Sequence, residues 1–305
     1  MKTSLRWVLV MVLVLLTAFL IYKVLFPGTT NTQNKTSISN GRLEMVNSGD
    51  MEIGYRVYGK GHPLLMIMGY GSTMNLWEDK LINTLAEHFQ VIIFDNRGMG
   101  ESSAGEKEFS IEQFSDDALG LLDALKIEKT HVLGWSMGSY IAQELASRNP
   151  ERVNKLALYA SVPNPSMFPP SQEVMAKLED TTGTPEEQGS RWISLLFPEK
   201  WLENNGGRIK EIFYRPLGTI IPENIGKQSM AIGKWNGLEE RLSTLSHPTL
   251  LIAGKEDVLV PPGNSSYLKE KLPNATLSLI ENTGHGLMFQ DPDQFSQVLI
   301  EFLKK

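Results

Sequence analysis

From Gly41 onward, short runs of β-branched and apolar residues alternate with amphipathic stretches, and this alternation restricts the possible folds more than any other feature of the sequence. Parallel strands joined by crossover helices produce such a pattern. Eight runs have the length and composition of strands. They are Leu43–Val46, Ile53–Tyr58, Leu64–Met68, Val91–Asp95, His131–Trp135, Lys155–Tyr159, Thr249–Ala253 and Thr276–Ile280. The sequence therefore predicts an α/β fold with a mostly parallel, eight-stranded sheet and helices on both faces.

Two of the expected helices have recognisable start signals. Ser110, followed three residues later by Gln113, forms a capping-box pattern before a helix that runs toward Lys126. Asp291, followed by a proline, starts the last helix of the chain. Both helices fall outside the strands, as the alternation requires.

The N-terminus has the composition of a membrane segment. Lys2 and Arg6 precede the run Trp7–Phe26, which is apolar apart from Lys23 and has about the 20 residues needed to cross ~30 Å of hydrocarbon. We expect the first 26 residues to form an uncleaved signal anchor and residues 27–40, which are small and polar, to form a flexible stalk. The protein would then be a single-pass protein of the cell membrane with its folded domain on the extracytoplasmic side. A cleaved signal peptide and a secreted protein are the alternative.

Composition excludes several classes of function. The formal net charge of -6 does not provide the basic surface that binds a nucleic-acid backbone, so no nucleic-acid partner is expected. The chain has no cysteine, which rules out thiol nucleophiles, thiolate metal sites and disulfides. A length of 305 residues fits one domain with an insertion.

The segment HVLGWSMGSY, residues 131–140, contains the pattern Gly-x-Ser-x-Gly between a predicted strand and a predicted helix. A serine on this tight turn has a strained backbone, and glycines two residues away on either side prevent steric clashes. The helix N-terminus also favours developing negative charge. An ordinary strand-to-helix turn is the alternative, but it does not account for the partner residues described next. Ser136 is the candidate nucleophile.

A serine becomes an effective nucleophile only when a base removes its proton. Among the five histidines, His285 is the best candidate, because it lies in a glycine-flanked loop directly after the last predicted strand. The other four fit turns or the ends of elements. Asp257 follows the strand Thr249–Ala253 and precedes two prolines, so it is the candidate acid that orients the histidine. The neighbouring Glu256 is its rival.

Two backbone N–H groups are candidates for an oxyanion hole. One belongs to Met137, the residue after the candidate nucleophile. The other belongs to Tyr70 in MGYGS, residues 68–72, directly after the strand Leu64–Met68. A glycine-rich turn that merely reverses the chain is the alternative for the second segment.

The segments MGYGS, FDNRGMGES, GWSMGS, GKEDVLVPP and NTGHG occur in one order. From Gly41 to Lys305 the chain resembles the α/β-hydrolase superfamily, particularly its capped esterases, enol-lactonases and related hydrolases with a Gly-x-Ser-x-Gly turn. The chain order of Ser136, Asp257 and His285 is the order found in that superfamily.

The resemblance also assigns residues outside the candidate triad. It implies that Asp95, Arg97 and Gly98 belong to a structural loop beside the oxyanion turn. Many relatives have a histidine where this chain has Met68, before Gly69. That histidine is not a triad residue, so its replacement implies altered support for the oxyanion loop and leaves catalysis plausible.

The alternation of strands and helices stops between about Val162 and Ser246, where proline-rich turns separate helical pieces. We expect residues 162–246 to form a helical cap inserted between the core segments 41–161 and 247–305. The aromatic residues of such a cap can form its own core or line a substrate pocket, and each one alone is more often a core residue. The pocket candidates, with one tryptophan from the core, are Trp135, Trp192, Trp201 and Trp235.

These features together predict a serine hydrolase that acts on a carboxylic ester, lactone or related acyl compound through an acyl-enzyme. The substrate is expected to be a small, apolar molecule, and no metal or organic cofactor is implied. Serine in the turn disfavours the related dehalogenases and epoxide hydrolases, which use an aspartate there. Amide, peptide or carbon–carbon bond hydrolysis and perhydrolase activity remain alternatives, because fold alone does not separate them. A ligand-sensing or signalling module with little turnover is the alternative from another class.

Overall fold

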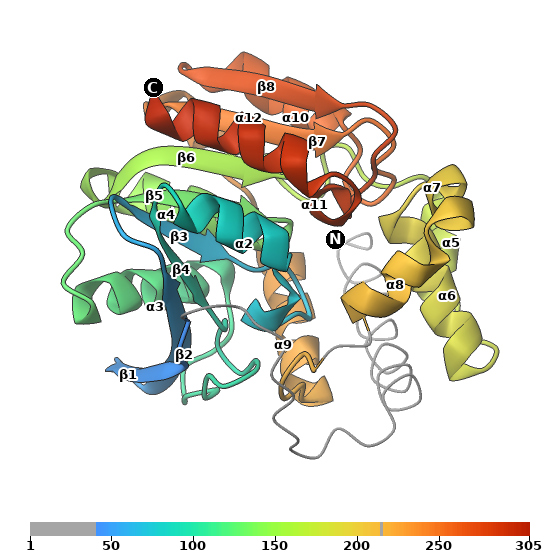
Figure 1. Ribbon diagram of the computed structural model, residues 1–305, viewed down its shortest axis with the longest axis horizontal. Coiled ribbons are helices and arrows are strands. Elements are labelled where there is room, and N and C mark those ends of the chain that lie inside the picture. The colour runs from blue at the N-terminus through green and yellow to red at the C-terminus, as the bar shows by residue number, and fades with distance from the viewer. Residues whose placement is uncertain (1–40, 214–215) are drawn as a thin grey trace.

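An eight-stranded sheet forms the centre of the computed structural model, which describes residues 41–213 and 216–305 (Figure 1). Its strand order is β1-β2-β4-β3-β5-β6-β7-β8. Strand β2 pairs antiparallel with β1 and β4, and the remaining neighbours are parallel. The strands are β1 (Glu44–Ser48), β2 (Met51–Tyr58), β3 (Pro63–Ile67), β4 (Gln90–Phe94), β5 (Thr130–Trp135), β6 (Val153–Tyr159), β7 (Thr249–Gly254) and β8 (Ala275–Ile280). The predicted eight-stranded, mostly parallel sheet is therefore confirmed.

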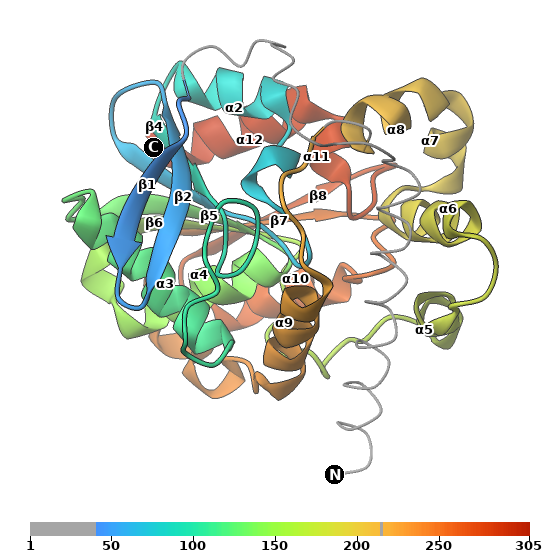
Figure 2. The same ribbon diagram turned by 90° about the horizontal axis from the view of Figure 1, so that it is seen from below.

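Helices cover both faces of the sheet (Figures 1 and 2). One face carries α2 (Asp79–Ala86), α11 (Leu287–Gln290) and α12 (Pro292–Lys304). The other face carries α3 (Ile111–Ala124), α4 (Met137–Arg148) and α10 (Gly263–Lys271). Between these layers the central strands are apolar on both sides, and β5 and β7 are buried along their whole length.

The predicted start signals of two helices have the expected local chemistry. The Ser110 side chain accepts a hydrogen bond from the N–H of Gln113 at 3.0 Å, and α3 begins one residue later. The reciprocal half of the capping box, from the Ser110 N–H to the Gln113 side chain, does not form, and the Gln113 Nε2 donates to Asp117 at 2.9 Å. At α12, the Asp291 side chain caps the helix by accepting from the N–H of Gln294 at 2.9 Å.

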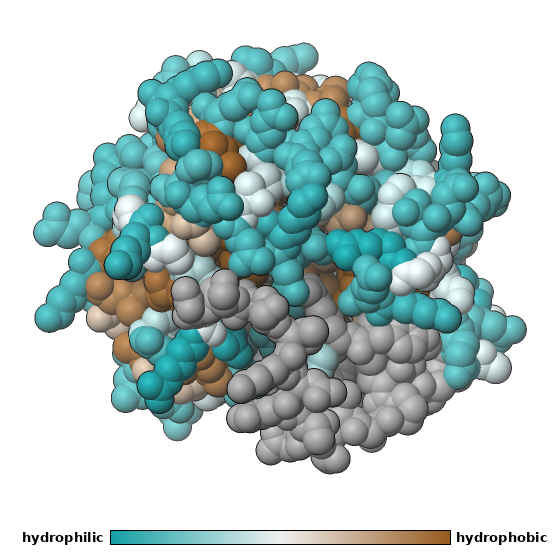
Figure 3. All heavy atoms as spheres, in the orientation of Figure 1, coloured by the Kyte–Doolittle hydropathy of each residue, from teal (hydrophilic) through white to brown (hydrophobic). Residues whose placement is uncertain are grey.

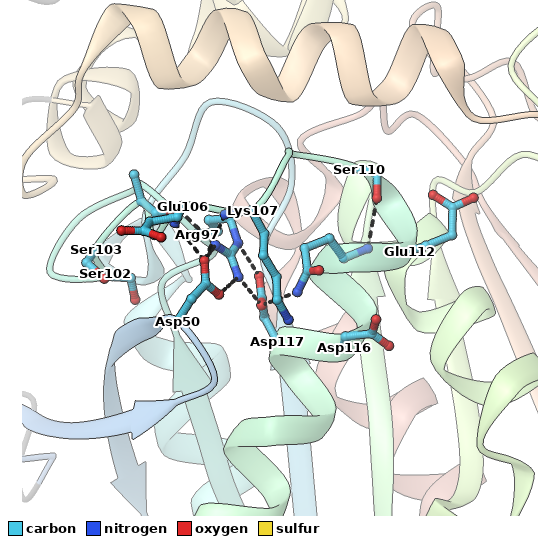
Figure 4. A network of polar contacts seen from close by, with 12 residues as sticks. Asp50, Arg97, Ser102, Ser103, Glu106, Lys107, Ser110, Glu112, Asp116 and Asp117 are labelled. Atoms are coloured by element: carbon cyan, nitrogen blue, oxygen red, sulfur yellow. Dashed lines mark hydrogen bonds and ion pairs between the residues drawn. The ribbon is translucent and has the colours of Figure 1, made fainter.

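A buried arginine holds the loop after β4 against the rest of the core. Figure 4 shows the Arg97 guanidinium pointing between the carboxylates of Asp50 and Asp117. Its Nη2 lies 2.8 Å from Asp50 Oδ1 and 2.6 Å from Asp117 Oδ1. The hydrogen bonds from Arg97 hold the pKa of Asp50 well below its ordinary value. As the resemblance implied, Arg97 therefore has an architectural role, because it joins the β1–β2 turn, the β4 loop and α3.

Between β6 and β7 the chain leaves the sheet and forms helices, in the segment where the cap was expected. They are α5 (Gln172–Glu179), α6 (Pro185–Leu196), α7 (Glu199–Asn204), α8 (Gly206–Phe213) and α9 (Pro222–Lys234). Both ribbon views show α5 to α8 grouped at one side of the molecule and α9 standing apart from them (Figures 1 and 2). The cap therefore has two parts.

The expected signal anchor, residues 1–26, and the expected stalk, residues 27–40, lie outside the described residues. In residues 41–213 and 216–305, no helix has the length and apolar character needed to cross a membrane. The side of the molecule in Figure 3 is mostly hydrophilic where the structure describes it, and its hydrophobic residues gather in small patches.

Candidate active site

Ser136 lies at the turn between β5 and α4 and has an unusual backbone. Its φ and ψ are 53° and -121°, a conformation that costs a non-glycine residue on the order of 1–3 kcal/mol. The flanking glycines have no room for a side chain. A Cβ on Gly134 would lie 2.2 Å from the carbonyl oxygen of Gly138, and one on Gly138 would lie 2.1 Å from that of Ile67. The turn therefore requires glycine at both positions, as the sequence pattern predicted.

Hydrogen bonds fix the Ser136 backbone without using its side chain. Its N–H donates to the carbonyl of Tyr159 at 2.9 Å. Its carbonyl accepts from the N–H and the hydroxyl of Ser139, at 2.8 Å and 2.6 Å. The Ser136 hydroxyl makes no hydrogen bond to any described residue, so it is available to a substrate.

His285 and Asp257 form a buried pair. His285 Nδ1 lies 2.8 Å from Asp257 Oδ2, and both residues are about 95% buried. The other carboxylate oxygen, Oδ1, accepts from the N–H groups of Leu259 and Val260, at 2.9 Å and 2.8 Å. The rival acid, Glu256, is exposed, so its carboxylate does not share this buried position.

The backbone of His285 is held by Tyr159, a residue that sequence reasoning did not single out. The Tyr159 hydroxyl donates to the His285 carbonyl and accepts from the N–H of Met288 at 3.4 Å. Its ring stacks on that of Trp135, with centroids 5.8 Å apart. Burial raises the pKa of Tyr159 well above its ordinary value, so it stays a neutral donor. The one sequence signal for this role is a tyrosine at the carboxyl end of a central strand.

Ser136 and His285 both line a cavity of about 640 Å³ under the cap. Apolar side chains of the core and of both cap parts form most of its wall, among them Leu76, Ile193, Phe213, Ile225 and Ile232. No hydrogen bond joins Ser136 to His285 in the described structure, a separation common in free enzymes that closes when substrate binds.

Three of the four candidate tryptophans line this cavity: Trp135, Trp192 and Trp235. Trp235 is also fixed to the core, because its ring stacks on Tyr140 at 4.9 Å and its Nε1 donates to Glu144 at 2.9 Å. Trp201 is not among the lining residues.

The position of Trp201 has a simple physical explanation. Its ring stacks on Phe197 with the centroids 4.7 Å apart, inside the cap. Trp201 therefore belongs to the packing of the cap itself, which is the alternative that the sequence left open for each tryptophan.

The two candidate oxyanion donors belong to segments next to the serine. Met137 is the first residue of α4, and neither its N–H nor that of Tyr70 has a hydrogen-bond acceptor within the described chain. Gly69 brings the Tyr70 loop close to the nucleophile, since a Cβ on Gly69 would lie 3.4 Å from the Cβ of Ser136. Gly69, Tyr70 and Met137 all line the same cavity.

Support for this loop comes from a residue missed at the sequence level. The Asn96 side chain donates to the carbonyl of Met68 at 3.0 Å. Met68 is the position at which many relatives have a histidine. Asp95, next to Asn96, accepts from the N–H of Met74 at 2.6 Å and from that of Glu101 at 2.9 Å. Burial raises the pKa of Asp95 to about 6. The loop after β4 thus supports the loop after β3, as the resemblance implied.

No group of three or more His, Asp or Glu side chains that could hold a metal ion occurs in residues 41–213 and 216–305.

Comparison with known proteins agrees with the fold. A family model described as alpha/beta hydrolase fold matches residues 62–185. The putative carbamate hydrolase RutD of Pseudomonas savastanoi is 32% identical over 246 residues, which cover 79% of this chain and 93% of the relative.

Solved structures with the same fold cover most of this chain as well. An alpha/beta hydrolase fold protein from Chitinophaga pinensis has a TM-score of 0.74 and 25% identity, covering 86% of this chain and 97% of its own. The enol-lactonase from Burkholderia xenovorans LB400 has a TM-score of 0.73 over 86% of this chain and 100% of its own, but at 23% identity it shows the fold alone. The sheet order, the strained serine turn and these relatives lead to the same conclusion: this chain belongs to the α/β-hydrolase superfamily.

Proposed function

We propose that this hydrolase cleaves a carboxylic ester, lactone or related acyl substrate through a covalent acyl-enzyme. One observation carries the proposal: a strained, unpaired serine and a buried histidine–aspartate pair open on the same largely apolar cavity. In the proposed roles Ser136 is the nucleophile, His285 the general base and Asp257 the acid that orients the base.

The proposed reaction has two halves. Ser136 Oγ bonds to the acyl carbon while its proton passes to His285 Nε2. The bond from the acyl carbon to the leaving oxygen then breaks, and the proton on Nε2 passes to that oxygen. Water repeats the attack with the same base and releases the acid and the free serine. Asp257 stabilises the imidazolium in both halves, since its Oδ2 lies 2.8 Å from Nδ1.

The N–H groups of Tyr70 and Met137 are proposed to bind the oxyanion of each tetrahedral intermediate. They are oriented before substrate arrives, because one belongs to a helix N-terminus and the other to a loop held by side-chain amides. A donor of this kind contributes about 3–4 kcal/mol to the transition state.

The substrate is proposed to be a small, largely apolar acyl compound, because most residues that line the cavity are aliphatic or aromatic. A carbamate ester is a second candidate, since the relatives at 30–32% identity are named as putative carbamate hydrolases. Its serine chemistry would be the same, with a carbamoyl group in place of the acyl group.

A fluorophosphonate experiment tests the proposal. We expect stoichiometric modification of Ser136, and multiple turnovers on p-nitrophenyl esters of graded chain length or on aryl carbamates. Ser136→Ala should lose both properties while keeping its fold. Modification without turnover on any member of the panel would favour a ligand-sensing protein, and no modification at all would contradict the nucleophile assignment.

We also propose that the protein is held in the cell membrane by its N-terminal segment, with the folded domain on the extracytoplasmic side. The run Trp7–Phe26 and the basic residues before it support this. The full-length protein should stay in membranes after a carbonate wash and keep its N-terminus. Recovery of a mature form that begins between Ala18 and Thr36 would instead indicate a secreted enzyme.

A further inference from the structure

The loop Met68–Thr73, which carries the Tyr70 N–H, depends on side chains for its shape. Gly71 has a φ of 66°, in the left-handed region, and the loop makes no ladder hydrogen bonds because β3 ends at Ile67. Two side-chain amides hold its Met68 and Gly71 peptides, and at its end the Thr73 hydroxyl donates to the Leu217 carbonyl. Asn96, from the core, donates to the Met68 carbonyl at 3.0 Å. Gln228, from cap helix α9, accepts from the Gly71 N–H at 2.9 Å.

Gln228 is well placed to act as a fixed support. It lies 157 residues away from Gly71 in the sequence and is fully buried. Its Oε1 must face Gly71, because an N–H group needs an acceptor, and its Nε2 makes no hydrogen bond to a described residue. The contact with Gly71 is thus the one that orients the carboxamide.

Helix α9 is itself attached to the core, so it offers a firm base for Gln228. One turn earlier on the same face, Asn224 Nδ2 donates to the Gly98 carbonyl at 2.8 Å. Just before the helix, the Thr219 carbonyl accepts from the N–H of Gly100 at 2.8 Å. This part of the cap is therefore joined to the loop after β4 by two hydrogen bonds besides the Gln228 contact, whereas α5 to α8 lie apart from it (Figure 2).

We propose that Gln228 is a positioning residue for catalysis: from the cap, it sets the orientation of the loop whose Tyr70 N–H binds the oxyanion. This inference rests on the function proposed above. The Gly71 N–H belongs to the peptide that follows Tyr70, so fixing it restricts the backbone rotation that aims the Tyr70 N–H. Without the Gln228 acceptor, the Tyr70 N–H is still present but no longer points at the oxyanion. The cap then contributes to the chemical step as well as to enclosing the substrate.

The experiment compares Gln228→Leu with Asn224→Leu. Both changes remove a buried amide that joins α9 to a core loop, but only the first touches the oxyanion loop. We expect Gln228→Leu to lower kcat about 10-fold with KM nearly unchanged, because misplaced donors act on the transition state alone. Binding of a trifluoromethyl ketone, which forms an oxyanion on Ser136, should weaken by the same factor. Asn224→Leu should change neither value by more than about twofold, because the backbone hydrogen bond from the Gly100 N–H to the Thr219 carbonyl and the Gln228 contact itself still hold α9 against the core.

Gln228→Glu provides a rescue, because it keeps the length and an acceptor oxygen. We expect its kcat within about threefold of the wild type, even if Gln228→Leu proves too unstable to purify. Equal kcat in Gln228→Leu and wild type, equal loss in both leucine variants, or a Gln228→Glu enzyme as slow as Gln228→Leu would each overturn the proposal. A wild-type protein that neither turns over esters nor reacts with fluorophosphonate would instead overturn the proposed function, which separates the two failures.

Discussion

Replacing Asp257 with asparagine tests the proposed histidine–aspartate pair most sharply, because the structure predicts how the new side chain must turn. Asp257 uses Oδ2 for His285 Nδ1 and Oδ1 for the N–H groups of Leu259 and Val260. Asparagine has one acceptor oxygen for these three donors. We expect that oxygen to stay on the two backbone N–H groups, which cannot move, and the NH2 group to face His285.

That orientation forces the wrong tautomer on the base. An NH2 group facing Nδ1 requires Nδ1 to be unprotonated, so the proton of the neutral ring moves to Nε2. Nε2 can then no longer accept the proton of Ser136, and the imidazolium also loses its neighbouring negative charge. Together these effects should lower kcat about 10^4-fold, or about 5.4 kcal/mol at ~1.36 kcal/mol for each factor of ten.

The assay is steady-state hydrolysis of a p-nitrophenyl ester, with thermal unfolding as a check on the fold. Fluorophosphonate modification of Ser136 should slow in parallel, since it needs the same proton transfer. Glu256→Gln is the matched control, because its exposed side chain is one residue away, and its kcat should stay within about twofold of the wild type. A kcat of Asp257→Asn within tenfold of the wild type would refute the tautomer argument. A larger loss of kcat in Glu256→Gln than in Asp257→Asn would show that Glu256 is the acid.

Three further predictions concern the cavity and the core. Trp192→Ala should change the preferred acyl chain length in an ester panel, because Trp192 lines the cavity, whereas Trp201→Ala should lower the melting temperature with the same preference profile. Arg97→Met should lower the free energy of unfolding in urea by about 3–5 kcal/mol, because it leaves two carboxylates without their buried partner; a loss under about 1 kcal/mol would contradict this role. Because Arg97 lowers the pKa of Asp50 in the folded state, that group stabilises the fold above its unfolded pKa of about 3.9 and the effect disappears as the pH falls. Urea midpoints measured between about pH 5 and 2 should therefore fall more steeply for the wild type than for Arg97→Met.

The sheet could be predicted from the sequence because each strand is a local signal, a short apolar run between turn residues. The residues at which each strand begins and ends could be predicted less well. β2 begins at Met51, two residues before the predicted start, because Met51 pairs with Ser48 across a tight turn. That extension depends on the partner strand, and no single run of residues encodes it.

The nucleophile turn was predictable for a similar reason, since its glycines and its serine lie within five residues of one another. The support of the oxyanion loop was not. Asn96 and Gln228 are ordinary amides in the sequence, and the second meets its partner only when the cap folds over the core. The cap tryptophans posed the same difficulty, because Trp192 and Trp201 lie in similar helical segments and only the packing of those helices decides which ring faces the cavity.

The geometry of the serine turn has a consequence for how this protein can be varied. The position of residue 136 is determined by the backbone of the turn. A side chain at Gly134 or Gly138 would collide with backbone carbonyl oxygens, which cannot move aside. Those two positions leave no mutational freedom. Position 136 itself faces open space, so another short polar side chain can occupy it without altering the scaffold. A mutant library that fixes both glycines and varies residue 136 would search different reactions within one unchanged architecture.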